Sequence, residues 1–279
     1  MTPELEPALT NPPDTSNRDR ATGLIQWCVA WVRRTVLPRR VLFVTAGIGL
    51  ALVAVLTVAG GVVYDAVAED DGVSGLDRPV LEEAIRLRNP TVDTALTWFT
   101  HLGGPLGMTI IALAITVAIV WRLRRRTPLV VMVLGVAGSL VLTIVGKNLF
   151  NRQRPPLADA VPPYESSPSF PSGHSLNSTV IAGLVAYLVI RELVRLLARI
   201  LVAVAAAAWA LAMGASRVFL GHHWLTDVMF GWLVGLAWLA VMITGHRLYL
   251  SVRGPHAEHA PDEAVSIPDG RSRPSTPAS

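Results

Sequence analysis

The chain has little cysteine, little lysine and little charge. Cys28 is its only cysteine among 279 residues, which excludes an intrachain disulfide and a metal centre built on cysteines. Lys147 is its only lysine, so 23 arginines supply the rest of the basic charge. Charged residues form 16% of the chain, whereas a soluble domain carries about a quarter. This scarcity argues against a soluble protein of this length.

Long apolar runs take the place of the missing charge. Hydrophobic residues make up 52% of the chain, and each run approaches the roughly 20 residues with which a helix crosses about 30 Å of hydrocarbon. The second run is short and can extend backwards through Trp98 and Phe99. We therefore expect an all-α, polytopic membrane protein with six transmembrane helices. The runs cover residues 41–63, 104–121, 128–146, 174–190, 198–215 and 226–245.

The remaining segments differ from these runs in composition. Residues 1–40 form a polar cytoplasmic tail in which 21–37 suit either an amphipathic helix lying on the bilayer or a plain juxtamembrane extension. Residues 76–103 predict two short outer helices, separated at Asn89-Pro90. Residues 248–279 are rich in Pro and Ser and predict a disordered cytoplasmic tail. The six-helix domain is thus expected to occupy residues 41–247.

Arginine sets the expected orientation. With a cytoplasmic N-terminus, 17 arginines fall on inner segments and 6 on outer ones. This asymmetry follows the positive-inside rule and explains the pI near 9.8 better than nucleic-acid binding does. Both termini are predicted to be cytoplasmic, in the cell membrane. The arginine-dominated, Ala- and Val-rich composition is typical of a bacterial protein.

Polar clusters lie where apolar runs meet the predicted outer face. Lys147, Arg154 and Arg217 would supply three cations for a phosphoryl group, two of them forked. Ser172 and Gly173 would add a hydroxyl and a close backbone approach at a helix N-terminus, where anions bind readily. The clusters are Lys147 to Arg154-Pro155, Pro171-Ser172-Gly173-His174, and Ser216-Arg217 with His223 and Asp227.

Two histidines and an aspartate complete a set of catalytic groups. His223 and Asp227 are four residues apart and share a helical face, so the carboxylate can hold one imidazole nitrogen and leave the other free to attack. His174 is placed to protonate the leaving oxygen as a general acid. The predicted site is therefore a phosphate site at a membrane surface.

These three blocks resemble the signature of the type 2 phosphatidic-acid phosphatase and haloperoxidase superfamily: K-x6-R-P, P-S-G-H and S-R-x5-H-x3-D. Every position and spacing matches. The resemblance implies that His223 forms a phosphohistidine, with Asp227 as its partner and His174 as the acid. It also implies that Lys147, Arg154, Ser172, Gly173 and Arg217 bind the phosphoryl group, with no metal and no other cofactor.

Neighbouring residues receive lesser roles. His222 has threonine rather than aspartate four residues on, which favours a place in the wall of the site. Arg152 is expected to be a solvated or headgroup-facing charge. The loop 155–170 is expected to cover the site and influence headgroup choice.

The expected function is hydrolysis of a lipid phosphate or diphosphate at the extracytoplasmic face, with a membrane lipid and the bilayer as partners and no nucleic acid. Undecaprenyl diphosphate is slightly favoured over phosphatidylglycerol phosphate and phosphatidic acid. Phosphoryl transfer between lipids is an alternative, and a non-catalytic transporter or lipid-binding scaffold is another.

Overall fold

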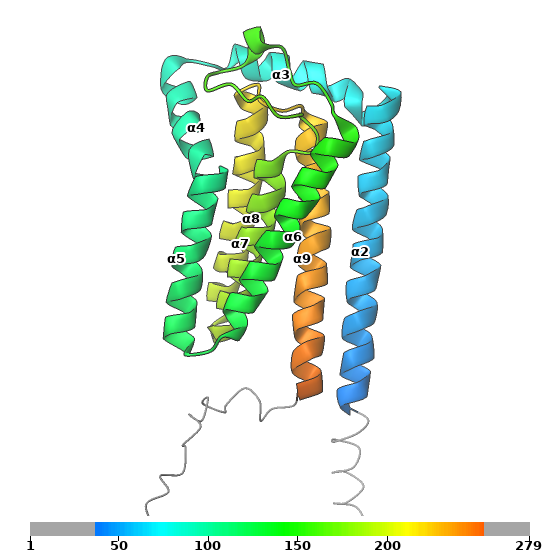
Figure 1. The fold of residues 1–279 in the computed structure, drawn as a ribbon, viewed down its shortest axis with the longest axis vertical. Coiled ribbons are helices and arrows are strands. Elements are labelled where there is room, and N and C mark those ends of the chain that lie inside the picture. The colour runs from blue at the N-terminus through cyan, green and yellow to red at the C-terminus, as the bar shows by residue number, and fades with distance from the viewer. Residues whose placement is uncertain (1–36, 254–279) are drawn as a thin grey trace, which may run out of the picture.

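Parallel and antiparallel helices form one bundle in the computed structural model, which describes residues 37–253 (Figure 1). Within that range the chain contains helices, turns and loops and no strand. The predicted interfacial segment and most of the predicted C-terminal tail lie outside the described residues. The long helices are α2 (Leu37–Glu69), α5 (Pro105–Leu123), α6 (Thr127–Phe150), α7 (Gly173–Glu192), α8 (Leu196–Phe219) and α9 (Leu225–Arg253). The short elements are η2 (Gly72–Leu76), α3 (Asp77–Arg86), α4 (Pro90–Leu102) and η3 (Leu157–Asp159).

The expectation of an all-α polytopic fold is confirmed. Between residues 37 and 253, five helices are long and apolar enough to span a membrane. A sixth span results if α4 and α5 are counted together; they bend by 51° against each other where Gly103 and Gly104 separate them. Counted in this way, the second span includes Trp98 and Phe99, as the shortness of the second apolar run indicated. Asn89 begins α4, because its side chain accepts a hydrogen bond from Val92 N at 3.0 Å.

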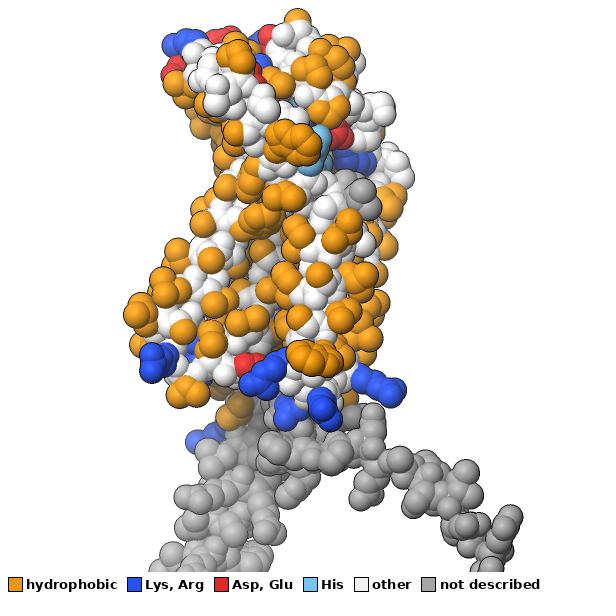
Figure 2. Space-filling model, turned by 90° about the vertical axis from the view of Figure 1, so that its left-hand side faces the viewer, with side chains coloured by type: hydrophobic (Ala, Val, Ile, Leu, Met, Phe, Trp, Pro, Cys, Tyr) orange, Lys and Arg blue, Asp and Glu red, His pale blue; other side chains and the backbone are white. Residues whose placement is uncertain are grey.

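The flank of the bundle is apolar over most of its height (Figure 2). Large side chains such as Phe43, Trp121 and Val133 are more than half exposed, which in water would be an aggregation hazard but suits contact with lipid. Basic side chains gather at the lower end of this surface (Figure 2). That distribution agrees with the predicted orientation, which itself stays a prediction.

Close contact between α7 and α9 aligns the two helix starts that carry candidate site residues. A Cβ atom at Gly231 would lie 2.8 Å from the carbonyl oxygen of Ser172, and one at Gly235 would lie 2.9 Å from that of Leu176. Any larger side chain would push the backbones apart, so these two glycines permit the close packing of α7 and α9. The first turn of α7 is thereby held against the first turn of α9.

The short helix α3 lies across the end of the bundle opposite the start of α2 and the end of α9 (Figure 1). Just beyond it, Arg88 Nε donates to the carbonyl oxygen of Phe219 and Arg88 Nη1 donates to that of Asp159, each at 2.8 Å. The end of α8 is thus tied to the segment that follows α6. These ties hold the connection between α8 and α9, residues 220–224, in which His223 lies.

Candidate active site

The predicted site residues meet at the α3 end of the bundle. Lys147 lies in the last turn of α6, and Arg217 in the last turn of α8. Ser172 precedes α7, while Gly173 and His174 begin it. His223 lies just before α9 and Asp227 in its first turn. Arg154 comes from the loop between α6 and α7.

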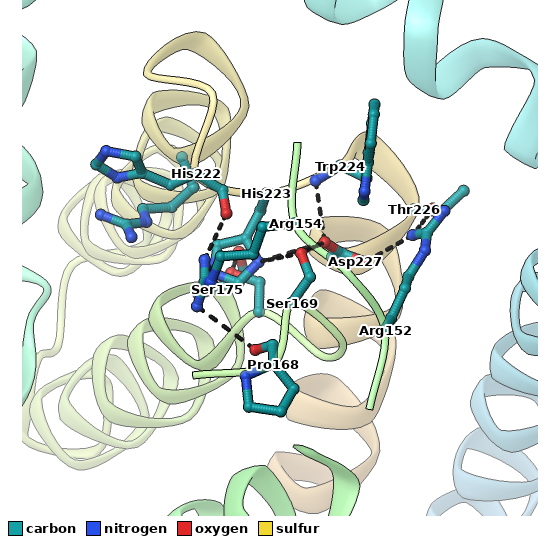
Figure 3. A network of polar contacts seen from close by, with 12 residues as sticks. Arg152, Arg154, Pro168, Ser169, Ser175, His222, His223, Trp224, Thr226 and Asp227 are labelled. Atoms are coloured by element: carbon teal, nitrogen blue, oxygen red, sulfur yellow. Dashed lines mark hydrogen bonds and ion pairs between the residues drawn. The ribbon is translucent and has the colours of Figure 1, made fainter. Parts of the chain in front are cut away.

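His223 and Asp227 form a buried pair, as the four-residue spacing predicts. His223 Nδ1 lies 3.3 Å from Asp227 Oδ2, and the two side chains are 2% and 0% exposed. Asp227 Oδ2 also accepts from Trp224 N at 2.9 Å and from the Ser169 hydroxyl. These bonds fix the carboxylate on one side of the imidazole (Figure 3).

The partners of His223 also determine its tautomer. Arg154 Nη1 lies 3.3 Å from His223 Nε2, and because a guanidinium can only donate, Nε2 must carry the lone pair. The proton is therefore on Nδ1, facing Asp227. Burial, followed by the charges of Arg154, Arg217 and Lys147, lowers the pKa of His223 well below its ordinary value. The imidazole thus stays neutral at pH 7, with Nε2 available as a nucleophile.

The three predicted phosphate-binding cations converge on residues 165–168 of the loop 155–170. Lys147 Nζ donates to Ser167 Oγ at 3.0 Å and to the Pro168 carbonyl. Arg154 Nε donates to the Ser167 carbonyl at 2.7 Å. Arg217 forms an ion pair with Glu165, whose other oxygen lies 3.6 Å from Arg154 Nη2. The loop therefore lies over the cations, as expected, and supplies them with oxygen ligands.

Glu165 occupies a place in which an anionic phosphoryl oxygen could sit. Burial by itself would raise the pKa of Glu165, but Arg217 and Arg154 together lower it to about 2. The carboxylate is therefore ionised at every working pH. A phosphoryl oxygen that engages Arg217 Nη2, the atom bonded to Glu165, must displace this carboxylate. The same loop also borders an open cavity of about 570 Å³ lined by Arg154, Tyr164, Ser167 and His222.

Replacing Glu165 with glutamine should make the ligand-free protein less stable. It should also increase the stabilisation that added inorganic phosphate produces. Arg217 would then be a buried cation without its main partner, at a cost of about 1–3 kcal/mol, reduced because Glu165 is 32% exposed. Inorganic phosphate would meet no competing carboxylate. We expect a lower melting temperature in detergent and a larger upward shift on adding phosphate than in the wild type.

Asp159→Asn is the matched control, because Asp159 pairs with Arg78 at 3.3 Å on the surface, in the same loop. It should melt close to the wild type and respond to phosphate as the wild type does. An equal phosphate shift in E165Q and D159N would contradict the placement of Glu165 in the anion site.

The first turn of α7 places Ser172, Gly173 and His174 together. Ser172 Oγ caps the helix by bonding Ser175 N at 3.4 Å and Ser175 Oγ at 2.9 Å, and Ser172 N donates to the Asp227 carbonyl at 3.1 Å. Gly173 has no space for a side chain, because a Cβ would lie 2.9 Å from Thr143 Cγ2. The predicted position of both at a helix N-terminus is thus observed, while their contact with phosphate stays a prediction.

His174 forms no hydrogen bond to any residue between 37 and 253. Its Nε2 lies 3.6 Å from the point where a Cβ of Gly104 would be, next to the break between α4 and α5. The imidazole therefore lies beside the break between α4 and α5. Its role as a general acid stays a prediction.

Arg152 is the one residue whose expected environment is wrong. Its side chain is 20% exposed, and it bonds Asp227 Oδ1 at 2.6 Å, Asp77 Oδ2 at 2.8 Å and Thr226 Oγ1 at 2.8 Å. Asp77 lies 75 residues earlier, so no local spacing could indicate this ion pair. The fully buried carboxylate of Asp227 attracts the guanidinium, which therefore points inward rather than toward solvent or headgroups.

Two further contacts were also absent from the sequence-based site. Ser169 donates to Asp227 and lies 3.4 Å from His223 Nδ1. Thr226 donates to Asp77 through both its backbone and its hydroxyl. Their only signal in the sequence is adjacency to the Pro171 and Asp227 blocks.

His222 lies in the wall of the site, as expected. Its Nε2 is 2.6 Å from the Val161 carbonyl, and burial followed by Arg217 lowers its pKa to about 4. A neutral Nε2–H therefore donates to Val161. His222 anchors the loop beside the cations, while its own backbone carbonyl accepts from Arg154.

Comparisons with known proteins bear on the family of the chain. Residues 128–249, which contain all the site residues named from the sequence, match the PAP2 superfamily. The chain is 31% identical over 167 residues to phosphatidylglycerophosphatase B of Bacillus subtilis (strain 168), covering 60% of this chain and 81% of that protein.

A solved structure is similar over a comparable range. It is the crystal structure of a transmembrane PAP2-type phosphatidylglycerolphosphate phosphatase from Bacillus subtilis, with a TM-score of 0.64 and 27% identity. The alignment covers 70% of this chain and 96% of that one. The family resemblance of the sequence motifs is confirmed. The chain belongs to the PAP2 superfamily, as a multi-pass membrane phosphatase.

Proposed function

We propose that this protein removes the terminal phosphate from a phospholipid of the phosphatidylglycerol phosphate class, through a phosphohistidine at His223. The observation that carries the proposal is the buried His223–Asp227 pair, whose unprotonated Nε2 faces the cation Arg154. The similarity to phosphatidylglycerophosphatase B supports the lipid class. It favours phosphatidylglycerol phosphate over undecaprenyl diphosphate, for which no specific support exists.

The first step transfers the phosphoryl group to the enzyme. His223 Nε2 attacks phosphorus while the bond to the lipid oxygen breaks, and His174 donates a proton to that oxygen. Asp227 holds the Nδ1–H and stabilises the positive charge that develops on the imidazole. Lys147, Arg154 and Arg217 neutralise the phosphoryl oxygens once Glu165 has moved away.

The second step restores the enzyme. Water attacks phosphorus, His174 now accepts a proton from that water, and the bond from phosphorus to His223 Nε2 breaks. Inorganic phosphate leaves and His223 returns to its neutral form. If another lipid hydroxyl took the place of water, the same step would give the lipid-to-lipid transfer that the sequence left open.

The position of the site suits a substrate embedded in a membrane. The cations lie at the α3 end of the bundle, where the apolar flank gives way to polar and charged side chains (Figure 2). A phosphate at the headgroup plane could enter there while its acyl chains stay in the bilayer. The arginine distribution supports an extracytoplasmic site, since the opposite end carries most of the basic residues.

Phosphate release by the purified protein in detergent tests this function. Phosphatidylglycerol phosphate, phosphatidic acid and undecaprenyl diphosphate should be compared at matched surface concentration, with EDTA present. We expect the highest kcat/KM with phosphatidylglycerol phosphate, in line with the similarity to phosphatidylglycerophosphatase B. EDTA should leave the rate unchanged, since residues 37–253 contain no group of three metal-ligating side chains.

Two outcomes of this assay would contradict the proposed substrate or the proposed activity. A higher kcat/KM with the diphosphate would restore undecaprenyl diphosphate as the substrate. Absence of phosphate release from all three lipids, with folded protein, would favour the lipid-binding scaffold instead.

A further inference from the structure

Asp77 lies on the opposite side of Asp227 from His223. It is the first residue of α3 and is 5% exposed. Its Oδ1 accepts from Thr226 N at 2.9 Å, and its Oδ2 accepts from Thr226 Oγ1 at 2.7 Å. Thr226 N is one of the first-turn donors of α9 that have no partner within the helix. Asp77, which belongs to α3, therefore caps the N-terminus of α9 at Thr226, the residue before Asp227.

Arg152 joins the two carboxylates. Its Nη1 bonds Asp227 Oδ1 at 2.6 Å and its Nη2 bonds Asp77 Oδ2 at 2.8 Å (Asp227 and Arg152 in Figure 3). A single guanidinium thus holds both carboxylates through separate nitrogens. Asp77 therefore helps to hold the Asp227 carboxylate in position in two ways. It caps the start of α9, which carries Asp227, and it binds Arg152, which binds Asp227.

The charges of this group bear on the reaction. Arg152 beside Asp227 alone would give a neutral pair and weaken the pull of Asp227 on the His223 Nδ1–H. Asp77 shares the guanidinium and leaves one net negative charge over the three side chains. That charge favours the cationic imidazole formed when Nε2 is phosphorylated.

We propose that Asp77 is a positioning residue for the Asp227–His223 pair, which it orients through Thr226 and Arg152 and whose negative charge it sustains. The inference rests on the proposed function, because it assigns His223 the nucleophilic role. Asp77 contacts neither His223 nor the place of the phosphoryl group directly. It acts from a helix that lies outside the segment matched to the family, residues 128–249.

Several other charged or titratable groups also influence the protonation of His223, and a pH test must take them into account. These groups largely determine the pKa of His223, and Asp77 adds a smaller contribution. Removing Asp77 should therefore shift this pKa, while His223 remains the group that titrates. The groups that face His223 are Lys147 from α6, Arg154 and Glu165 from the loop, His174 from α7, Arg217 from α8 and Asp227 from α9.

The variant D77N tests the proposal. Its amide oxygen can still accept from Thr226 N, but its amide nitrogen cannot accept from Arg152, and the negative charge is gone. We expect kcat for lipid-phosphate hydrolysis to fall about 10- to 100-fold. The acid limb of the kcat/KM profile should move to lower pH, because removing a negative charge makes protonation of His223 harder.

Two further variants separate charge from folding. E83Q also replaces a carboxylate on α3 with an amide, but at Glu83, whose side chain is 57% exposed and forms a surface ion pair with Arg86. This variant should keep the wild-type kcat and pH profile. D77E keeps the charge but displaces the carboxylate, so kcat should fall while the acid limb stays at its wild-type pH. Melting curves in detergent identify the folded variants.

Two results would overturn the inference. In the first, folded D77N has the same kcat and the same acid limb of the kcat/KM profile as E83Q. In the second, D77E shifts the acid limb to lower pH as D77N does. If D77N does not fold, wild-type kcat in D77E overturns it. Failure of the proposed function is distinguishable, since the wild type would then release no phosphate from any of the three lipids, or His223→Asn would retain turnover.

Discussion

His223→Asn should abolish lipid-phosphate hydrolysis, lowering kcat by about ten-thousand-fold or more. Asparagine can fill much of the same space, but its amide nitrogen has no lone pair with which to attack phosphorus. The partners of His223 assign its lone pair to Nε2 and its proton to Nδ1. That tautomer is the one a nucleophile held by Asp227 needs. Phosphate release and acid-labile labelling of the protein by a radioactive lipid phosphate would both disappear.

His222→Asn is the matched comparison, because it makes the same change at the adjacent residue. His222 binds the Val161 carbonyl and anchors the loop, so its loss should lower the melting temperature and reduce kcat far less than H223N does. The labelled phosphoenzyme should still form in H222N. Labelling that survives in H223N and disappears in H222N would reverse the assignment of the nucleophile.

The helices and the main site residues could be predicted because both depend on local patterns. Apolar runs of about 20 residues determine the spans, and the fixed spacing of His223 and Asp227 places them on one face. The second span was the least regular. Gly103 and Gly104 interrupt it, and His174 Nε2 lies next to Gly104 at this break.

The environments of Arg152 and Glu165 could not be predicted, because each depends on partners distant in sequence. Arg152 needs Asp77, which reaches it only when α3 folds across the end of the bundle. Glu165 needs Arg217, from another helix, and the two meet only after the loop has closed over the cations. In both, the low exposure of the partner makes pairing obligatory. Composition gives no measure of that exposure.

Arg217→Gln should lower kcat/KM by about 100- to 1,000-fold, the second largest effect expected. Arg217 is 2% exposed and is held by Thr100 Oγ1 at 3.1 Å and by Glu165. Its Nε is buried and has no hydrogen-bond partner within residues 37–253. Buried donors are rarely left unpaired, so this N–H suits a phosphoryl oxygen that replaces Glu165. Arg217→Lys should recover little of the rate, because an ammonium lacks the forked donors.

Stability must be separated from catalysis in this variant, because R217Q also leaves Glu165 without its main partner. The double variant R217Q/E165Q removes both charges and should regain melting temperature over R217Q while remaining as slow. Arg78→Gln removes an exposed arginine from an ion pair at the same end of the bundle and should keep the wild-type kcat/KM. If R217Q/E165Q recovered both stability and rate, Arg217 would only be the counter-ion of Glu165. Persistent loss of rate in a stable protein would instead place Arg217 on the phosphoryl group, since the double variant has already removed its role as the counter-ion of Glu165.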